Sequence, residues 1–443
     1  MAAVQAAWTS RFGFLMAAIG FAVGLGNIWR FPYVAGENGG SAFVLVYLLF
    51  VFLIGIPILI AEISLGRQGR ASPPLTFAAL AGAGTPWRHV GHLNLLTAFT
   101  IMIVYTVVAG WVLYYFYLAV TSGFGGYDGA VAQNRFDQLL ASAQTSGFWS
   151  LLPVLAAAAI VYAGVEKGIE RAVSLLMPML FLLMLGLAVY NGFNGGTGAA
   201  LDYLLTPDFS KITPQVMLAA VGQAFFSMGV AMAGMMVFGA YLPERVNVAS
   251  SAVIIGVADT VVALVAGLVI FPMVFLHGLD PAGGSGLIFV TLPVAFAGIS
   301  SWVAITFFLL LSVAAVTSLV GLYEPVVAWL IDRFTMSRRR AVVLLGAATA
   351  LGGVISTLTY NHWATVAWFG RSLADWMDFI PNQLFLPLGG LLIAVFAAWK
   401  LSPGGATPQA VGLSAGLLTA WQRLLRFLVV PAVLVILVTG LIS

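Results

Sequence analysis

Three carboxylate side chains lie in stretches of the sequence that are otherwise apolar enough to cross a bilayer. They are Glu62, Asp259 and Glu324. An ionisable group inside a membrane is costly, and such residues usually belong to an ion or substrate path. The sequence offers no lysine or arginine near mid-membrane to pair with them. We therefore expect a bound cation to compensate Asp259.

Polar oxygen atoms that would suit such a cation occur in the same kind of segment. Sodium prefers oxygen ligands, which broken-helix transporters supply from unwound backbone and from polar side chains. Besides Asp259, the candidates are Asn27, Ser227, Thr317 and Ser318. For the last two an alternative stays open, because hydroxyls in membrane helices often bond only to their own backbone.

Two apolar segments are interrupted where a helix would normally continue. The first reads "AVGLGNIWRFP" at 22–32, and the second reads "AFFSMGVAMAG" at 224–234. A membrane helix breaks only where protein or a hydrated cavity replaces the lost hydrogen bonds. A matched pair of breaks predicts a transporter built from an inverted repeat, with its site at the midplane. Close helix packing at small residues is the alternative.

The elements that must position these residues are membrane spans. The chain is 61% hydrophobic and 7% charged, whereas soluble domains are about 25% charged. Eleven apolar runs approach the length of about 20 residues that a helix needs to span a bilayer. They lie near residues 12–35, 41–66, 93–121, 148–164, 171–192, 215–241, 250–278, 300–331, 341–358, 376–399 and 422–442. We therefore expect an all-α polytopic membrane protein with eleven transmembrane helices.

The basic residues predict the orientation, because cytoplasmic loops keep the excess of lysine and arginine. With the N-terminus inside, the cytoplasmic segments hold Arg11, Arg67, Arg70, Arg88, Lys167, Arg171, Arg245, Arg333, Arg338, Arg339, Arg340, Lys400, Arg423 and Arg426. The other side keeps only Arg30, Arg135, Lys211 and Arg371. An odd number of spans then places the C-terminus outside, and we expect no cleaved signal peptide.

Several function classes are disfavoured. The absence of cysteine excludes disulfides and thiolate metal sites. The sequence contains no HExxH-type motif or nucleophile–base pair, so we do not expect an enzyme. The net charge of +3 follows from the membrane orientation, and we expect no nucleic-acid partner. We also expect one membrane domain without an appended soluble domain.

A family resemblance is carried by four stretches: "GFAVGLGNIWRFPYVAGENGGSAFVLVYLL", "GIPILIAEISLGRQG", "GQAFFSMG" and "TSLVGLYEPVVAWLID". They resemble the signatures of the neurotransmitter:sodium symporter family, whose bacterial members resemble the leucine transporter. The resemblance runs from about residue 8 to about residue 400. It implies a five-plus-five inverted repeat with broken first and sixth helices, and sodium-coupled symport of an amino acid by alternating access.

The implied domain organisation has three parts. Residues 1–400 would form the transporter core, with one repeat at about 12–192 and the other at about 215–399. Residues 401–443 would hold a cytoplasmic loop and the eleventh helix. We expect the stretch 401–420, with Pro403, Pro408 and four glycines, to be too broken for a twelfth transmembrane helix. The family usually has twelve spans, and the missing helix lies outside the five-plus-five core, where its loss would affect a homodimer interface and not transport.

The resemblance also implies two sodium sites. The first would use the backbone of Ala22 and the side chains of Asn27, Ser227 and Asp259, completed by the substrate carboxylate. The second would use carbonyls of Gly20, Val23 and Ala314 with the hydroxyls of Thr317 and Ser318. Glu62 and Glu324 match positions with structural roles.

The implied substrate site lies between the two breaks. The substrate carboxylate would meet the amides of Leu25 and Gly26 and the hydroxyl of Tyr105, because N–H groups at a half-helix start favour an anion. The amino group would face carbonyls of Ala22 and of the break near Phe226 and Ser227. The side-chain pocket would be lined by Ile101, Val108, Phe226, Gly229, Met232, Ser318 and Leu322.

Three residues refine the expected substrate. Gly24 stands where monoamine members of the family carry an aspartate, so this substrate should bring its own carboxylate. Gly229 and Met232 suggest an adaptable apolar pocket. We therefore expect a neutral amino acid with a large aliphatic or aromatic side chain.

Asp259 departs from the family pattern. Chloride-dependent relatives place a serine one turn further along, where this chain has Ala263. The fixed charge of Asp259 would replace chloride, and an adjacent sodium ion would keep the carboxylate ionised. We expect chloride-independent transport. The alternative is an aspartate that merely caps a helix break.

The gates follow from the same resemblance. Arg30 and Asp378 would close above the substrate, with Phe226 as the lid beneath. On the cytoplasmic side Asp332 matches the gate aspartate and Trp8 the tryptophan that fills the inner path. The usual arginine partner of Asp332 is replaced by Gln5, so either Arg11 or another basic group substitutes or the inner gate is weaker.

Gly168 and Pro178 flank a segment of the fifth span that can unwind at modest cost, because both residues weaken a helix. Such unwinding would let water reach the second sodium site, and a simple kink is the alternative. We expect symport across a bacterial plasma membrane. A sensor or a channel on the same scaffold is the other function class.

Overall fold

The computed structural model describes residues 7–82, 84–284, 286–401 and 411–442 of the chain. Within these residues, nine helices are long and apolar enough to cross a membrane. They are Ser41–Gly69, Arg88–Thr121, Ala143–Tyr162, Val165–Asn194, Val248–Leu276, Ser301–Phe334, Arg338–Leu358, Leu373–Lys400 and Ala415–Leu441. They correspond to nine of the eleven predicted spans. The two other spans are the interrupted ones.

The first interrupted span consists of two helical pieces at an angle of 46°. Helix α1 covers Arg11–Ala22, and the Ser10 side chain caps it by accepting the N–H of Gly13. After the break, a π-helical turn, called a wide turn below, covers Gly26–Arg30, and helix α2 covers Phe31–Glu37. The predicted break is confirmed at Val23 to Leu25.

The second interrupted span divides into α11 (Pro214–Ser227) and α12 (Gly234–Ala240). Three residues between them or beside α12 have left-handed backbone: Gly229 (φ 63°), Ala231 (φ 63°) and Ala233 (φ 64°). Glycine adopts this conformation readily, whereas alanine does so only at a cost. Neither half is long enough to span alone, so this span is completed only by the two halves together.

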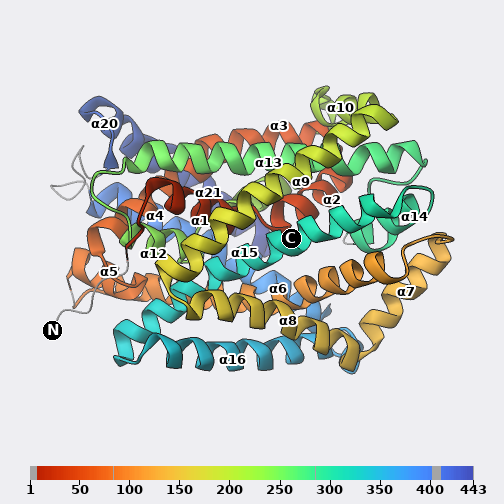
Figure 1. Ribbon diagram of the computed structural model, residues 1–443. Coiled ribbons are helices and arrows are strands. Elements are labelled where there is room, and N and C mark those ends of the chain that lie inside the picture. Colours follow the sequence, from red (N-terminus) through yellow and green to blue (C-terminus); the bar gives the residue numbers. More distant parts are fainter. Residues whose placement is uncertain (1–6, 83, 285, 402–410, 443) are drawn as a thin grey trace.

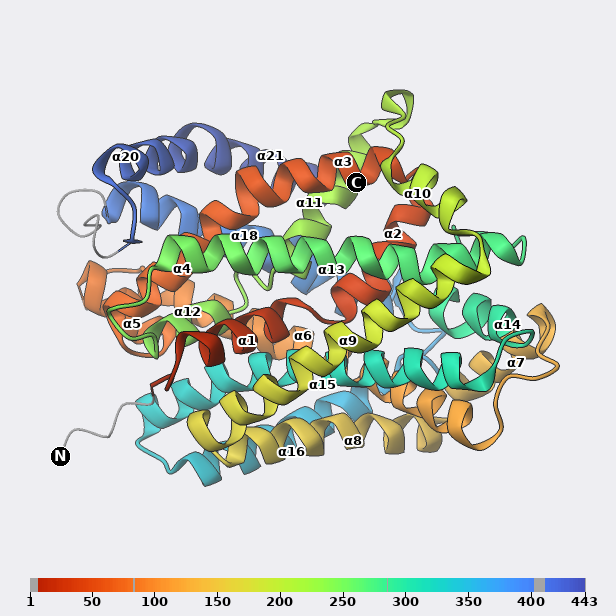
Figure 2. The ribbon, with the colours of Figure 1, turned by 45° about the horizontal axis from the view of Figure 1, so that its top comes forward.

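The long helices run side by side, and the two broken segments lie among them (Figures 1 and 2). Helix α6 (Arg88–Thr121) packs against α15 (Ser301–Phe334) and α8 (Ala143–Tyr162), and α16 (Arg338–Leu358) covers α8. On the opposite edge lie α3 (Ser41–Phe50), α4 (Ile56–Gly69) and α13 (Val248–Leu276). Helices α1, α11 and α12 are thereby held in the interior.

Shorter elements cover the ends of the bundle. They are α5 (Pro73–Ala81), α7 (Gly129–Ala141), α10 (Thr197–Leu205), α14 (Leu292–Phe296) and α17 (Leu373–Phe379). A two-residue antiparallel hairpin joins β1 (Ala367–Trp368) to β2 (Arg371–Ser372), with Trp368 opposite Arg371. Helix α17 continues through the wide turn Ile380–Phe385 into α18 (Leu386–Val395).

The last span begins earlier than the sequence predicts. Helix α20 covers Ala415–Leu424 and continues through the turn Leu425–Val429 into α21 (Val430–Ile442). The Ser414 side chain caps this start by accepting the N–H of Leu417, and Leu418 and Trp421 are buried. The eleventh span therefore starts at residue 415, whereas the sequence predicted a start near residue 422. Residues 402–410 lie outside the described part of the chain.

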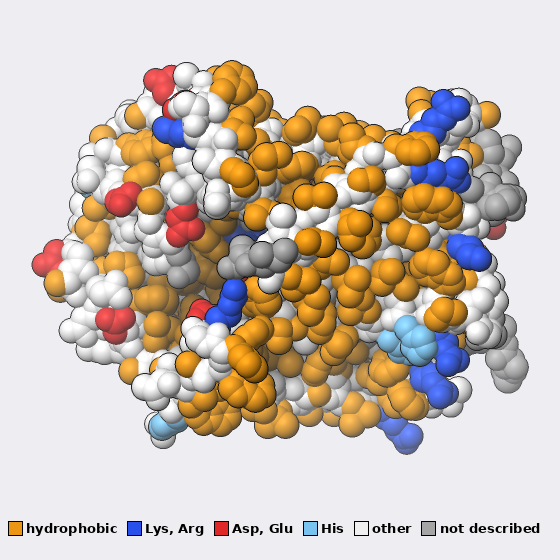
Figure 3. Space-filling view, turned by 180° about the vertical axis from the view of Figure 1, so that it is seen from behind, with side chains coloured by type: hydrophobic (Ala, Val, Ile, Leu, Met, Phe, Trp, Pro, Cys, Tyr) orange, Lys and Arg blue, Asp and Glu red, His pale blue; other side chains and the backbone are white. Residues whose placement is uncertain are grey.

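The surface has a broad apolar belt between two polar ends (Figure 3). In that view the lysine and arginine side chains gather at one end and the aspartate and glutamate side chains lie mainly at the other. The basic end is the end at which the N-terminal residues lie (Figures 1 and 3). This distribution agrees with a protein that spans a membrane in a fixed orientation.

Candidate functional site

A fully buried carboxylate, Asp259 of α13, lies beside both helix breaks. Its exposed fraction is 0%. The Asn27 side-chain amide donates to its Oδ1 at 2.8 Å and to its backbone oxygen at 3.0 Å. The Ser227 hydroxyl donates to its Oδ2 at 2.8 Å. The structure thus brings together the three side chains that the sequence assigned to the first sodium site.

Tyr47 of α3 is a member of this cluster that the sequence analysis missed. Its hydroxyl donates to Asp259 Oδ2 at 3.3 Å and lies 3.2 Å from the Ser227 hydroxyl. A fully buried tyrosine usually needs a partner for its hydroxyl. In the sequence this residue is only a single tyrosine in an apolar span, and that does not indicate which group its hydroxyl contacts.

The second group of predicted sodium ligands lies between α1 and α15. The Ser318 hydroxyl points toward the carbonyl oxygens of Gly20 at 3.4 Å and Phe21 at 3.3 Å. The Thr317 hydroxyl instead donates to its own helix, to Val313 and Ala314. A side chain at Gly20 would come within 3.4 Å of Thr317 Cβ. Both side chains therefore lie beside Gly20, but the Thr317 hydroxyl fits the alternative of a backbone-bonded threonine.

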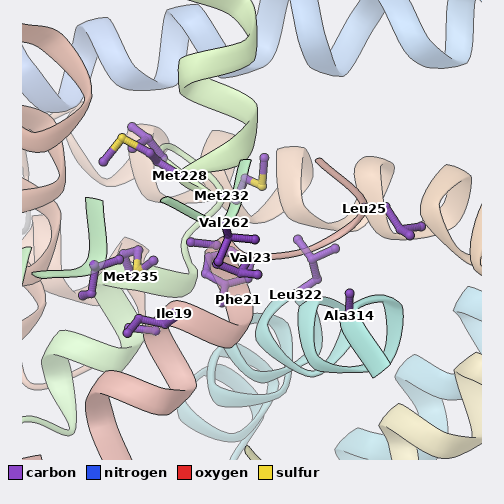
Figure 4. Packing of buried hydrophobic residues seen from close by; sticks show 14 of the residues in the cluster. Ile19, Phe21, Val23, Leu25, Met228, Met232, Met235, Val262, Ala314 and Leu322 are labelled. Atoms are coloured by element: carbon purple, nitrogen blue, oxygen red, sulfur yellow. The ribbon is translucent and has the colours of Figure 1, made fainter. Parts of the chain in front are cut away.

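A small cavity of about 20 Å³ separates the breaks from α6 and α15. It is lined by Phe21, Ala22, Gly24, Gly26, Ile101, Tyr105, Phe226, Gly229, Met232, Ser318 and Leu322. Most of the predicted substrate residues are in this lining, and Phe21 is one that the sequence analysis missed. Figure 4 shows the packing of Phe21, Val23 and Leu322 near Met232. A cavity of this volume holds a water molecule, so a larger occupant requires side chains to move.

Three predicted substrate residues lie elsewhere. Leu25 and Val108 line a separate outer cavity, and Ser227 is turned toward Asp259. The Leu25 amide nonetheless reaches the predicted carboxylate-binding group, because its N–H donates to the Tyr105 hydroxyl at 3.2 Å. Leu25 therefore takes part through its backbone, whereas its side chain lies on the outer side.

Gly24 has no room for a side chain. A Cβ at this position would collide with the Ser318 hydroxyl and would lie 3.0 Å from the Tyr105 hydroxyl. At Gly229 a Cβ would lie 2.8 Å from the ring of Phe21, and φ is 63°. An aspartate at position 24 would thus fill the space between the first break and Tyr105.

The outer gate residues surround a cavity of about 330 Å³ that includes Arg30, Phe226 and Asp378 in its lining. The Arg30 guanidinium lies 4.8 Å from the centre of the Phe226 ring and donates to Gln223 Oε1 at 3.2 Å. Asp378 instead accepts from the side-chain amide of Asn382. The structure places Arg30 and Asp378 at one cavity but forms no ion pair between these two described residues.

Gln223 is a second residue that the sequence analysis missed. It is fully buried, and its amide donates to the Gly26 carbonyl at 2.6 Å while its oxygen accepts from Arg30. It therefore links the first break to α11 and to the outer gate. The stretch "GQAFFSMG" contained it, but nothing in the composition marked it as a bridge.

Trp8, the predicted inner plug, is buried against α12. Its exposed fraction is 2%, its indole N–H donates to the Phe238 carbonyl at 2.9 Å, and its amide donates to the Tyr241 carbonyl at 3.1 Å. Its ring packs edge-on against Phe238. This arrangement ties the N-terminal segment to α12.

The other inner-gate residues are not paired with one another. Asp332 accepts the N–H of Ser72 at 2.8 Å, and Arg11 donates to the Ser250 hydroxyl at 2.9 Å. Gln5 lies outside the described residues. Arg11 therefore does not take the place of the missing arginine in this conformation.

Gly168 and Pro178 lie at the start of the fifth span. Gly168 belongs to a wide turn, Val165–Glu170, and Pro178 lies inside α9 (Arg171–Asn194). Gly168 is buried against the Ile160 carbonyl, which leaves no space for a Cβ. The segment between the two residues is helical in this structure, so it forms a wide turn followed by a proline-containing helix.

The two remaining intramembrane carboxylates have local partners. Glu62 Oε1 accepts the N–H of Ala231 at 2.8 Å, which holds the strained second break. Glu324 accepts from the Tyr241 hydroxyl at 2.8 Å and forms an ion pair with Arg338. The expectation that no basic residue reaches these carboxylates was therefore wrong for Glu324. The antiparallel packing of α15 and α16 brings Arg338 back to it.

The chemistry of the Asp259 cluster suits a hard monovalent cation. Its members are a carboxylate on α13, a carboxamide and a hydroxyl at the two helix breaks and a phenol hydroxyl on α3. A buried carboxylate without a basic partner among the described ion pairs gains from a bound cation. Broken helices supply this kind of site in ion-coupled transporters.

Comparison with known proteins gives one consistent result. The family model described as "Sodium:neurotransmitter symporter family" matches residues 5–129 and 131–376. An uncharacterized sodium-dependent transporter of Haemophilus influenzae is 33% identical over 98% of both chains. The uncharacterized sodium-dependent transporter YhdH of Bacillus subtilis is 34% identical over 97% of this chain and 96% of its own.

A solved structure is similar over nearly the whole chain. It is the crystal structure of MhsT in complex with L-phenylalanine. The TM-score is 0.91 and the sequence identity 39%, and the match covers 98% of this chain and 100% of MhsT. At this identity the likeness extends to the family and is not restricted to the fold.

Proposed function

Because the chain belongs to the sodium:neurotransmitter symporter family, whose members are transporters and not enzymes, we propose that it carries a large neutral amino acid into the cell together with sodium. That the chain is a sodium-dependent transporter and crosses the membrane several times follows from its family and from its long apolar helices. The finer proposal rests above all on one observation: Asn27, Ser227 and Asp259 meet at the two helix breaks.

We propose two sodium ions per transport cycle. The backbone of Ala22 with Asn27, Ser227 and Asp259 would hold the first. The backbone of Gly20, Val23 and Ala314 with Thr317 and Ser318 would hold the second. The first set is supported by its shared hydrogen bonds, and the second by the approach of Ser318 to the Gly20 carbonyl.

The substrate is proposed to be an amino acid that brings its own carboxylate. The lack of space for a side chain at Gly24 supports this, and the Leu25 amide with the Tyr105 hydroxyl offers donors for that carboxylate. Met232 and Phe226 would adapt to a large apolar side chain, since thioethers fill irregular spaces easily. The L-phenylalanine in the MhsT structure agrees with an aromatic or large aliphatic substrate.

We propose that transport does not require chloride. Asp259 supplies a fixed negative charge to the first sodium site, and its full burial makes that charge effective in a low dielectric. Ala263 lies one turn further along α13 and offers no hydroxyl for an anion. Chloride would therefore have neither a ligand nor an electrostatic role here.

Alternating access would use the outer gate of Arg30, Phe226 and Asp378 and the inner plug Trp8. The N-terminus would lie in the cytoplasm and the C-terminus outside, in a bacterial plasma membrane. A homodimer is compatible with this arrangement. The basic end shown in Figure 3 supports the proposed orientation.

The direct test is uptake by the purified protein in liposomes. A panel of labelled neutral amino acids is offered with an inward sodium gradient, with potassium in place of sodium, and with gluconate in place of chloride. We expect sodium-driven accumulation of leucine, phenylalanine or tryptophan that is unchanged in gluconate. If only glycine, proline or charged amino acids accumulate, the proposed substrate class is wrong.

The same liposomes separate transport from the other function class. A substrate-evoked current without accumulation of label would indicate a channel. Sodium-dependent binding without either current or accumulation would indicate a sensor. The small central cavity lined by Phe226, together with the aromatic packing of Trp8 on Phe238, favours transport over a continuous pore.

A further inference from the structure

A further buried carboxylate, Glu170, lies outside the sodium and substrate sites. It is the last residue of the wide turn that precedes α9, and its exposed fraction is 6%. It accepts three hydrogen bonds from the segment before α1. The donors are the Thr9 amide at 2.9 Å, the Thr9 hydroxyl at 2.5 Å and the Ser10 hydroxyl at 3.0 Å.

Residues at the start of α1 pack closely against this carboxylate. Gly13 of α1 packs directly on it, and a Cβ at Gly13 would collide with its oxygen and carbon atoms. The Ser10 hydroxyl also accepts the Gly13 N–H at 2.9 Å, so the same hydroxyl caps α1 and bonds to Glu170. The carboxylate therefore fixes both the start of α1 and the segment that leads to it.

This segment carries the inner plug. Trp8 directly precedes Thr9 and Ser10, and its indole ring bonds to and packs against Phe238 of α12. The arginine–aspartate pair expected at the inner gate is not formed by Arg11 and Asp332, which bond to Ser250 and Ser72. Glu170 supplies hydrogen bonds at the point where the plug joins α1.

Glu170 also belongs to the stretch of the fifth span between Gly168 and Pro178. Met177, nine positions after Gly168 on this stretch, packs against Gly20. A Cβ at Gly20 would lie 2.9 Å from the Met177 sulfur. Gly20 is a proposed ligand of the second sodium ion. One segment of the fifth span thus contacts α1 both beside the plug and beside that ion site.

We propose that Glu170 is the latch of the inner gate, a positioning residue that holds Trp8 in place until the segment from Gly168 to Pro178 unwinds. Unwinding carries Glu170 away from Thr9 and Ser10, and the loss of these hydrogen bonds releases the plug. Sodium at the second site, through Gly20 and Met177, keeps the segment helical and the latch closed. This coupling of sodium to the latch rests on the proposed function, whereas the latch itself rests on the hydrogen bonds.

The test is hydrogen–deuterium exchange of the full-length protein in lipid nanodiscs, read at residues 7–13 and 165–178. Wild type is compared with Glu170→Gln and Glu170→Ala. Hydrogen bonds to a charged group are worth enough to shift an equilibrium by about tenfold or more. We expect Glu170→Ala to raise exchange about tenfold in both segments together, and Glu170→Gln to raise it less because one acceptor oxygen remains.

The chain provides a matched control. Glu166 lies on the same turn and is exposed, so Glu166→Gln should exchange like wild type. If Glu170→Ala exchanges like Glu166→Gln, or if only one of the two segments responds, the latch is overturned. Should Glu170→Ala unfold and raise exchange everywhere, Thr9→Val decides: it leaves Glu170 in place, removes one hydroxyl donor and must still raise exchange in both segments.

The experiments distinguish a failure of the proposed latch from a failure of the proposed function. Exchange is measured without any substrate, so a wild-type protein that accumulates no amino acid can still show the latch. Sodium in place of potassium should lower exchange in both segments of wild type and have less than half this effect in Glu170→Ala. An equal sodium effect in both proteins would overturn the coupling of the second ion to Glu170.

Discussion

At the scale of single residues, the side chain that decides the chemistry is Asp259. It has no access to water, and its oxygens accept from Asn27, Ser227 and Tyr47. Hydrogen bonds stabilise a buried carboxylate but leave its net charge uncompensated. A sodium ion in the same cluster would remove that cost, so ion binding and the charge of this residue should be linked.

Asp259→Asn tests this link. Asparagine keeps the shape of the side chain and removes its charge, so sodium at the first site should bind more weakly. We expect the sodium concentration for half-maximal uptake in gluconate buffer to rise at least tenfold, because a close buried charge contributes about 1.4 kcal/mol or more. The measurement is labelled amino-acid uptake against sodium concentration.

A matched control is Asp378→Asn, which removes a carboxylate at the outer cavity but not at the sodium cluster. Its half-maximal sodium concentration should change less than threefold. Equal shifts in the two variants would mean that Asp259 acts only as a general source of negative charge. An unchanged Asp259→Asn would mean that the aspartate merely caps the helix break.

The residues that the sequence predicted share one property. Asn27, Ser227 and Asp259 are polar groups in apolar spans, and their cost in a membrane marks them without any knowledge of the fold. Tyr47, Gln223 and Glu170 escaped notice because each resembles an ordinary residue of a span or a helix end. Their roles depend on which helix faces them, and only the packing of the helices reveals that.

At the scale of elements, the fifth span has the property that its proposed role requires. Pro178 lies inside α9 and has no N–H for the carbonyl of Ser174, which lies four residues earlier. Gly168 begins the segment in a wide turn. A helix interrupted in this way loses a hydrogen bond and conformational preference, so it unwinds at lower cost than a regular helix.

Pro178→Ala should slow transport. Alanine restores the missing N–H and is about 3 kcal/mol more favourable than proline inside a helix, so unwinding becomes harder. We expect the maximal uptake rate to fall about tenfold while the dissociation constant of the amino acid at saturating sodium stays within twofold. Uptake kinetics and equilibrium binding of the labelled amino acid measure the two quantities.

Helix α8 contains a proline with no proposed part in gating, Pro153. Pro153→Ala restores a helix hydrogen bond in the same manner and should leave the uptake rate within twofold. If Pro178→Ala transports as fast as Pro153→Ala, the proline of α9 is a simple kink. A large loss of binding in Pro178→Ala would instead indicate a distorted site.

Spans were predicted well, since length and hydropathy suffice to find them, and the two breaks were recognised from glycine and polar residues. The side-chain contacts between different spans were not predicted. The ion pair of Glu324 with Arg338 joins a residue inside one predicted span to a residue just before the next. Arg338 starts α16 close to the end of α15, about 15 Å along the helix from Glu324 at 1.5 Å per residue, and its long side chain covers part of that distance.

At the scale of the whole molecule, charge is distributed along the axis of the bundle. Lysine and arginine gather at the end that holds the N-terminal residues, and acidic side chains lie mainly at the other end (Figure 3). The positive end of such a protein faces the cytoplasm. Counting α1 with α2 and α11 with α12 as one span each adds two to the nine long helices of the described residues. With this odd number we expect the last helix to end on the side opposite to the start of the first.

This topology makes a prediction that needs no knowledge of the substrate. The chain contains no cysteine, so each introduced cysteine is the sole target of a thiol reagent. Gly125→Cys lies in a loop where a side chain meets no neighbouring atom, Thr335→Cys is exposed between α15 and α16, and Leu441→Cys lies at the exposed end of α21. A membrane-impermeant maleimide added to intact cells should label Gly125→Cys and Leu441→Cys, whereas Thr335→Cys should be labelled only after permeabilisation. The reverse pattern would invert the protein. Labelling of Thr335→Cys together with Gly125→Cys would mean that α11 and α12 do not cross the bilayer as one span, because this broken helix lies between the two positions. Labelling of Thr335→Cys together with Leu441→Cys would mean that one of the three spans between them, Arg338–Leu358, Leu373–Lys400 and Ala415–Leu441, does not cross.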